Sequence, residues 1–283
     1  MKIVVLAGGI STERDVSLVS GMGIYKALKS KGHQVMLLDV FLGYANEDWK
    51  NVFEKDVDWT ASVGAIKDQN PDIDAVKALR PDWKKNFFGP HVIDICQQAD
   101  VVFMALHGEN GENGKIQACF DLNGIRYTGT DYVSSAICMN KAISKDLFAA
   151  GGVPTPVGIR LKKGETPDVQ VPYPCVVKAC CGGSSVGVVM ANNDEEYAAA
   201  LEEAFKYDDE VVIEQYIKGR EFSVGVVDGK AYPIIEIARS MASMIIRISI
   251  RRDRRLKHVR QNSVKRRHWP CRRQQSRLSR YCV

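Results

Sequence analysis

Residues 101–118 read VVFMALHGENGENGKIQA, an apolar run that ends directly in a loop of three glycines, two glutamates and a histidine. The six apolar residues of this run are typical of a buried parallel strand. Ligands of open α/β sheets bind beyond the carboxyl ends of the strands, so the loop is expected to line a binding crevice. Taken alone, the segment also fits a surface histidine ahead of a glycine-rich turn.

The first forty residues have the pattern of a strand, a helix and a second strand. Residues 2–7 form a short apolar run that ends in two glycines, and residues 34–40 form another. Between them, residues 11–13 can cap a helix whose inward-facing side chains are expected to be Val16, Val19, Ile24 and Leu28. Because such connections are right-handed, the two strands should lie side by side in a parallel sheet. Glu13 and His107 would then share one crevice.

The second half of the chain is expected to be mainly antiparallel. Residues 134–150 are typical of one helix, which glycines at 151 and 152 end. A second helix is expected at 194–205. Apolar runs separated by turns predict strands at 175–178, 186–190, 211–214, 221–227 and up to residue 237. Residues 41–90 are polar and irregular, as in an insertion.

Residues 181–187, Cys-Gly-Gly-Ser-Ser-Val-Gly, lie between two of these strands. Their small side chains leave backbone N–H groups free to approach an anion, as in loops that bind phosphate. A simple turn between strands is the alternative for this loop alone. Lys178 favours the phosphate interpretation, because an ammonium group just before such a loop can hold a phosphate as a point charge.

The composition fits a globular protein of two or three lobes, with 45% apolar and 26% charged residues among 283. No run of about 18 apolar residues is present, and the first apolar run is too short for a signal peptide, so a cytoplasmic protein without membrane partners is expected. The eight cysteines lack the paired spacing of a zinc site. They are expected to be mostly reduced thiols, and no metal ligands are predicted.

The charge is distributed unevenly along the chain. Residues 239–283 contain 13 Arg, 2 Lys and 1 Asp, a net charge of +14. The preceding 238 residues contain 24 basic and 33 acidic side chains, a net charge of −9. Nucleic acid binding through the tail is one alternative function, but the acidic body makes a nucleic acid partner the weaker hypothesis.

Several stretches resemble D-alanine–D-alanine ligases of the ATP-grasp family, in the family's order. The loop 107–118 matches one signature, and residues 8–18, GGISTERDVSL, resemble the N-terminal motif. The others are Met139-Asn140-Lys141, Gly183-Ser184-Ser185-Val186-Gly187, and Ile213-Glu214-Gln215-Tyr216-Ile217 through Arg220-Glu221-Phe222. The resemblance covers residues 1 to about 238.

The resemblance implies an α/β fold, with a parallel-sheet domain ahead of an ATP-grasp clamp of two antiparallel lobes. The expected boundaries are 1–139 for the N-terminal substrate-binding domain and 140–215 for the central lobe. Residues 216–238 would begin a C-terminal lobe that is truncated. Residues 239–283 would form an aberrant basic tail, expected to be disordered.

The implied reaction is the ATP-dependent joining of two D-alanines, used in peptidoglycan precursor synthesis. The carboxylate of the first D-alanine attacks the γ-phosphate of ATP, and the amine of the second displaces phosphate from the resulting acyl phosphate. Such catalysis depends on positioning and on neutralising charge. Close alternatives are ligases specific for D-serine or D-lactate as the second substrate. Relatives also suggest a homodimer.

The resemblance assigns roles to individual residues. Glu13 and Ser184 would be catalytic, with Glu13 binding the ammonium of the first D-alanine, and His107 and Ser17 would bind substrate. The implied ATP-binding residues are Lys141, Lys178, Gly183, Ser185, Val186, Glu214, Tyr216, Ile217 and Glu221. Without the resemblance, Glu13 fits a first-turn acid stabilised by the helix dipole, and Glu221 fits a solvated edge residue. Asn140 stands where many members have Asp, and Cys180-Cys181 where the family is usually more polar.

The tail departs from the family pattern after Ala238. The expected substrate-covering loop with its tyrosine, the catalytic arginine and the ligands of two Mg²⁺ ions are not recognisable there. ATP binding is therefore expected to be weak or absent, and ligase activity lost. A nucleic-acid-binding arm, a disordered basic extension and a reading-frame error are the three interpretations of this tail.

Codon arithmetic favours the reading-frame error. In the shifted frame, each codon consists of the third base of one present codon and the first two bases of the next. Met241-Ala242 then must encode Gly, and Met244-Ile245 must encode Asp. With permitted choices at degenerate positions, residues 241–262 can be translated as GFYDYKNKYQAGSTIETCPAE. This string resembles the substrate-covering loop that the family has at this point.

Overall fold

The computed structural model describes residues 1–64, 71–183 and 187–237. The chain divides into two compact units. Unit 1 comprises residues 1–141 and 180–186, and unit 2 comprises residues 142–179 and those from 187 onward. The basic tail predicted at 239–283 lies outside the described residues.

Unit 1 is built on a parallel sheet of three strands, β1 (Lys2–Ala7), β2 (Gln34–Asp39) and β3 (Val101–Met104). The strand order is β2-β1-β3, and both pairs are parallel. The sequence predicted these strands and their parallel pairing, and both are confirmed. Because β1 and β3 are parallel neighbours, the loops that follow them leave the same edge of the sheet.

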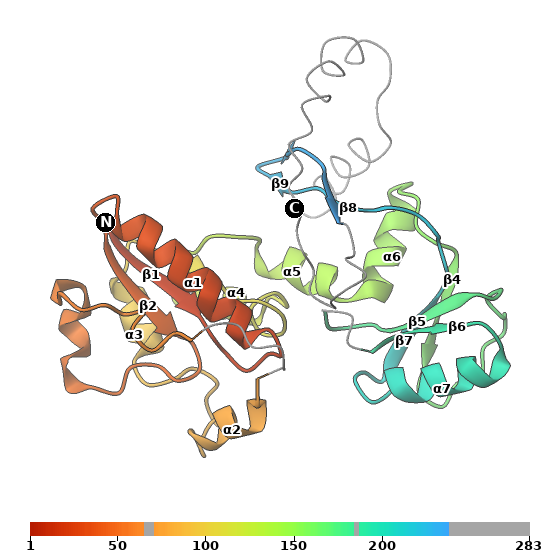
Figure 1. Ribbon diagram of the computed structural model, residues 1–283, viewed down its shortest axis with the longest axis horizontal. Coiled ribbons are helices and arrows are strands. Elements are labelled where there is room, and N and C mark those ends of the chain that lie inside the picture. The colour runs from red at the N-terminus through yellow and green to blue at the C-terminus, as the bar shows by residue number, and fades with distance from the viewer. Residues whose placement is uncertain (65–70, 184–186, 238–283) are drawn as a thin grey trace, which may run out of the picture. The chain divides into compact units, whose positions relative to one another are not determined.

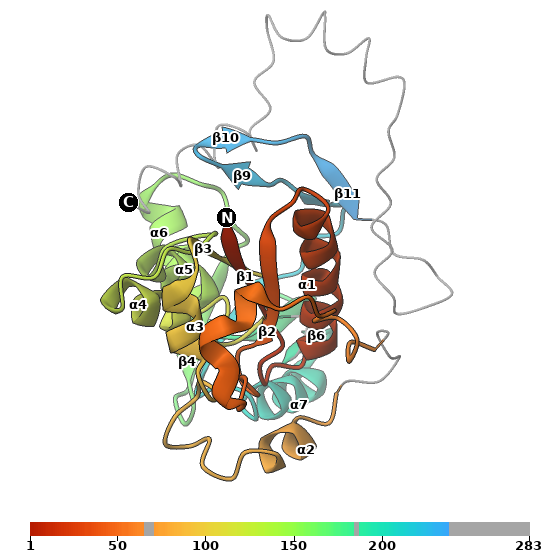
Figure 2. The same ribbon diagram turned by 90° about the vertical axis from the view of Figure 1, so that its left-hand side faces the viewer.

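Alternate residues of the sheet pack into two separate cores, as the two-residue period of a strand requires. Val4 and Leu6 face a core completed by α3 (Val92–Gln98) and α4 (Lys115–Leu122). The intervening Val5 faces the opposite core, which is covered by α1 (Arg14–Lys29). Figure 2 shows α1 on one side of the sheet and α3 and α4 on the other. The sheet is thus buried on both faces.

The inward face of α1 agrees with the prediction in part, since Ile24 and Leu28 pack against the core while Val16 and Val19 do not belong to it. Its buried residues are Arg14, Ser17, Gly21 and Tyr25, whereas Val16 is 37% exposed. A Cβ at Gly21 would lie only 2.9 Å from both the Ala7 Cβ and the Leu37 Cδ1 atoms. At Gly21 the helix therefore approaches the sheet too closely for a larger side chain.

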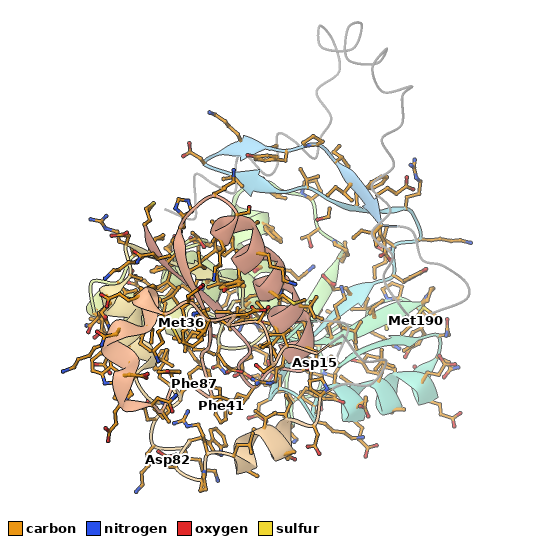
Figure 3. The ribbon with its side chains drawn as sticks, turned by 60° about the vertical axis from the view of Figure 1, so that its left-hand side comes forward. Asp15, Met36, Phe41, Asp82, Phe87 and Met190 are labelled. Carbon is orange, nitrogen blue, oxygen red and sulfur yellow. The ribbon has the colours of Figure 1, made fainter. Side chains whose placement is uncertain are left out.

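Residues 41–90 contain more regular structure than their sequence indicated. The 3₁₀ segment η1 (Glu47–Glu54) and helix α2 (Ile73–Ala78) lie within this stretch. Its aromatic residues join the core beside the sheet, where the Phe41 and Phe87 ring centroids are 6.1 Å apart. Figure 3 labels both side chains. The buried Arg80 guanidinium donates to the backbone carbonyls of Phe41, Asn86 and Phe87. This arginine holds the ends of the segment together.

The single helix predicted at 134–150 is wrong, because the chain breaks it in two. The two helices are α5 (Tyr132–Met139) and α6 (Lys141–Ala150), separated by Asn140 with extended angles of φ −90° and ψ 108°. The Lys141 N–H donates to the Cys180 carbonyl at 2.9 Å instead of continuing the helical pattern. This break directs Lys141 to the start of the glycine-rich loop.

Unit 2 contains an antiparallel sheet in the order β4-β7-β5-β6. Its strands are β4 (Gly158–Lys162), β5 (Cys175–Ala179), β6 (Val188–Ala191) and β7 (Glu210–Gln215), and helix α7 (Asp194–Ala204) packs on β5 and β6. The predicted strands at 175–178 and 211–214 and the predicted helix are confirmed. Strand β4 was missed because it is an edge strand with only Leu161 buried. Figure 1 shows α7 running along one face of this sheet.

The last described residues of unit 2 form two small strand pairs. Strand β8 (Glu221–Ser223) pairs with β11 (Ile235–Ile237), and β9 (Val226–Val227) pairs with β10 (Lys230–Ala231). The single strand predicted at 221–227 is therefore wrong, since two short strands occupy it. No helix within the described ranges is both long and apolar enough to cross a membrane.

Candidate functional site

The loops beyond β1 and β3 are fastened together by a buried serine. Ser17, at 0% exposure, accepts a hydrogen bond from the Gly8 N–H at 2.9 Å and donates one to the Ala105 carbonyl at 2.7 Å. Gly8 follows β1 and Ala105 follows β3. A single hydroxyl thus fixes the spacing of both loops, and this placement makes Ser17 a structural clamp at the edge of the crevice.

A second serine joins the same loops nearer to the predicted substrate residues. The Ser11 hydroxyl donates to the His107 carbonyl at 2.7 Å and accepts from the Glu13 N–H at 3.2 Å. Gly108 has a φ of +72°, and a Cβ there would lie 3.0 Å from the Glu13 Oε2 atom. The loops that carry Glu13 and His107 therefore lie side by side. Only glycine at position 108 leaves room for the Glu13 carboxylate.

Two further polar side chains, to which the sequence analysis gave no role, lie near His107 and Glu13. The His107 Nε2 atom is 3.4 Å from the Ser20 hydroxyl on α1. Glu112 is an exposed residue, yet partial desolvation in its loop raises its pKa, and the neighbouring Glu13 carboxylate adds to that rise. The position of Glu112 five residues after His107, in the same glycine-rich loop, was the available signal.

A buried ion pair holds the backbone of the loop after β1. The Arg14 guanidinium donates to the Gly9 carbonyl at 2.6 Å and forms a salt bridge with Asp39 at the end of β2. The Asp39 carboxylate also accepts from the N–H groups of Phe41 and Leu42, at 2.9 and 3.0 Å. The backbone that places Glu13 is thus held by charge-assisted hydrogen bonds.

The start of the glycine-rich loop lies in unit 1 with the loops that carry Glu13 and His107. The Lys141 ammonium donates to the Gly182 carbonyl at 2.9 Å. A Cβ at Gly183 would lie 3.9 Å from the Glu13 Oε2 atom, so this glycine is next to the carboxylate. The predicted residues Ser184, Ser185 and Val186 lie outside the described residues. Of the loop residues predicted to bind ATP, Gly183 is the one among the described residues.

Unit 2 contains a buried carboxylate bound by two lysines. Glu214, on β7, is 6% exposed. Its Oε1 atom accepts from Lys145 at 2.7 Å, and its Oε2 atom accepts from Lys178 on β5. Burial raises the pKa of Glu214, but the hydrogen bonds from the two lysines outweigh burial, and the pKa lies below its ordinary value. The structure therefore brings together the predicted Lys178 and Glu214 and adds Lys145, which the sequence analysis missed.

The remaining predicted residues of unit 2 follow this cluster along the chain. Tyr216 and Ile217 are exposed, at 41% and 60%, directly after β7. The Tyr216 N–H donates to the Pro174 carbonyl at 3.1 Å. Glu221 is an exposed residue on β8.

Neither metal clusters nor disulfides occur in the part of the chain that the structure describes. Its residues include no group of three His, Cys, Asp or Glu side chains that could hold a metal ion. Its six cysteines are free thiols. The side chains present thus suit ammonium and phosphate ligands, through carboxylates in unit 1 and lysines in both units, and do not fit a magnesium site.

Comparisons with known proteins agree with this arrangement. Residues 2–130 match the family model described as the D-ala D-ala ligase N-terminus, and residues 160–251 match that of the D-ala D-ala ligase C-terminus. Similar proteins are D-alanine–D-alanine ligases of Lacticaseibacillus casei, 46% identical over 244 residues, and Pediococcus pentosaceus, 44% identical over 245. Each alignment covers 84% of this chain and 67% or 68% of the relative.

Solved structures that resemble this chain also include D-alanine–D-alanine ligases. The ligase of Bacillus anthracis complexed with ATP is 30% identical, with a TM-score of 0.61. That alignment covers 88% of this chain and 70% of the other. The chain thus spans about two thirds of the length of the relatives it matches. Neither kind of match favours a nucleic-acid-binding protein.

Proposed function

The chain belongs to the D-alanine–D-alanine ligase family, with its ATP-grasp fold, and on that premise we propose how its residues serve ATP-dependent ligation of D-alanine. In that reaction a D-alanine carboxylate oxygen attacks the γ-phosphorus of ATP, and ADP leaves. The amine of the second D-alanine then attacks the acyl carbon, and phosphate leaves with the formation of the peptide bond. The chain's own residues bind and orient the reactants and neutralise the phosphates.

We assign the first D-alanine to the crevice of unit 1. The Glu13 carboxylate binds its ammonium group, and His107 lies near its carboxylate. The observation that carries this assignment is the joining of the two loops by Ser11 and Ser17, which holds Glu13 and His107 in one crevice. Fixed geometry of this kind is what substrate positioning requires. Glu13 would act together with Ser184 in the glycine-rich loop.

We assign nucleotide-binding roles to residues of each unit separately, to Lys141 and the glycine-rich loop in unit 1 and to the cluster around Glu214 in unit 2. Lys141 and Lys178 bind phosphates, together with Gly183, Ser185 and Val186, while Glu214 faces adenine. The Tyr216 N–H is already used by Pro174, so the Ile217 N–H is the amide of this pair that can donate to the base. Glu221 binds the ribose hydroxyls.

The further proposals concern the rest of the enzyme. Magnesium would be held by residues of the family that follow position 238, because the described residues do not offer a site. Residues 239–283 are best explained as translation in a shifted frame. We also propose a cytoplasmic location and a homodimer.

The activity test compares two proteins. The first is the 283-residue chain, and the second has residues from 239 onward translated in the shifted frame. Phosphate release that requires both ATP and D-alanine is expected at background in the first and clearly above it in the second. Loss of that release on Glu13→Gln in the second protein would support the assignment of the crevice. A frame-shifted protein that folds and stays inactive with D-alanine would contradict the proposed function.

A further inference from the structure

Lys145 of unit 2 uses every hydrogen of its ammonium group within the protein. Its Nζ atom donates to the Pro156 carbonyl at 2.6 Å, to the Glu214 Oε1 atom at 2.7 Å and to the Thr155 hydroxyl at 3.1 Å. An ammonium group has three donors, and here all three have acceptors. Its side chain is 17% exposed. Lys145 therefore has no donor left for a phosphate and is not a phosphate ligand.

Lys178 on the same carboxylate is differently placed. Among the residues that the structure describes, its hydrogen-bond partner is the Glu214 Oε2 atom, and its side chain is 29% exposed, the higher value of the two lysines. A nucleotide phosphate can therefore draw Lys178 away from Glu214. That movement frees the Oε2 atom, and it also removes one of the two positive charges beside a buried carboxylate.

A carboxylate in the interior is stable only while it is paired and hydrogen-bonded. When Lys178 turns to phosphate, the partner that still neutralises Glu214 in unit 2 is Lys145. Its bonds to Thr155 and Pro156 hold the ammonium in place, so the Oε1 atom stays fixed. The free Oε2 atom then faces the ligand as an ionised acceptor with no proton to donate.

We propose that Lys145 is a positioning residue that keeps Glu214 an acceptor only, so that the site selects a purine with an amino group at C6 over one with a carbonyl there. The inference rests on the proposed nucleotide site. A 6-amino group donates to the carboxylate, whereas a 6-carbonyl group places two acceptors against each other. Without Lys145, the buried Glu214 takes up a proton when Lys178 leaves, and it can then donate to a carbonyl.

The test measures binding of ATP and of inosine triphosphate to the full 283-residue chain without magnesium. Saturation-transfer NMR gives both dissociation constants even when binding is weak. We expect the unaltered chain to favour ATP by roughly tenfold, the discrimination that one good hydrogen bond to a charged group supplies. In Lys145→Met the ratio should fall to within about twofold, because Glu214 then offers both a donor and an acceptor. Lys145→Arg should restore part of it.

Two variants make the outcome specific. Lys206→Met removes an exposed lysine paired with Glu203 at 2.7 Å in the same unit, and it should leave the ratio unchanged. Glu214→Gln offers an amide N–H in place of a carboxylate oxygen and should move the preference toward inosine triphosphate. A purely structural role of Lys145 would weaken both nucleotides alike, with a lowered Tm and an unaltered ratio.

The measurements distinguish failure of the proposed role of Lys145 from failure of the proposed nucleotide site. If Glu214→Gln changes the ratio and Lys145→Met does not, the role of Lys145 is refuted while the nucleotide site stands. If neither variant changes the ratio, or if neither the unaltered chain nor the frame-shifted protein of the activity test binds nucleotide, the proposed nucleotide site fails and the inference fails with it.

Discussion

Gly8→Ala tests whether the loop after β1 depends on the space beside Asp39. Gly8 has a φ of +77°, and a Cβ there would lie 2.3 Å from the Asp39 Oδ2 atom. Ordinary contact begins at about 3.4 Å, so the carboxylate must move by roughly 1 Å. Asp39 is the partner of the buried Arg14 and accepts from two backbone N–H groups. The substitution therefore disturbs the whole network below Glu13.

The expected cost has two parts. An alanine with a positive φ costs about 1 kcal/mol. Weakening the buried pair of Arg14 and Asp39, together with its backbone hydrogen bonds, costs about 3 kcal/mol more. The sum of about 4 kcal/mol is a large fraction of the usual stability of a domain.

Gly32→Ala is the matched control. Gly32 has a φ of +81°, and nothing lies within 4 Å of a Cβ built there. It should therefore cost only the backbone part, about 1 kcal/mol. Urea unfolding followed by tryptophan fluorescence measures both variants, because Trp49, Trp59 and Trp83 all pack against the core of unit 1. Equal costs for the two substitutions would refute the claim that the Asp39 network limits position 8.

Three further substitutions test the supports of the site. Ser17→Ala leaves the Gly8 N–H and the Ala105 carbonyl without their partner. The free energy of unfolding, measured by urea titration, should fall by about 2 kcal/mol, and a loss below about 0.5 kcal/mol would contradict the role of Ser17 in joining the two loops. Arg80→Met removes the donor of three carbonyls and should cost about 3 kcal/mol in the same assay, with an unchanged urea midpoint as the contrary result. The pKa of Glu214 is lower in the folded protein than in the unfolded chain. Its ionised form therefore stabilises the fold at pH values above the ordinary carboxyl pKa, and this stabilisation is lost as the pH falls through the pKa of the folded protein. The Tm deficit of Glu214→Gln should accordingly be largest near pH 7 and shrink in acid, whereas a deficit that does not depend on pH would contradict the assignment.

The parallel sheet of unit 1 could be predicted because its strands are buried on both faces. Such strands are continuous apolar runs, and each ends in a glycine-containing loop, as at Gly8 and Gly108. Apolar spacing predicted Ile24 and Leu28 on the inward face of α1 but not its buried polar and small residues. Its closeness to the sheet depends on Gly21 fitting over Ala7 and Leu37, a contact between elements that no local pattern records.

The break at Asn140 was missed for a similar reason. Residues on both sides favour helix, and neither proline nor glycine separates them. The partner that ends α5 is the Cys180 carbonyl, forty residues later in the chain. A long-range hydrogen bond thus overrides local propensity, and it places Lys141 at the glycine-rich loop.

Three lysines near the proposed nucleotide-binding residues could not be told apart from the sequence. Lys141, Lys145 and Lys178 are equally cationic, and the sequence selected two of them through motifs. The third differs only in what surrounds it, since Thr155, Pro156 and Glu214 satisfy all its donors. A lysine without a free donor cannot bind phosphate, but it can hold a carboxylate ionised where burial would protonate it. The role of Lys145 therefore depends on its hydrogen-bond acceptors. These acceptors come together only when α6, the loop at 155–156 and β7 pack in unit 2.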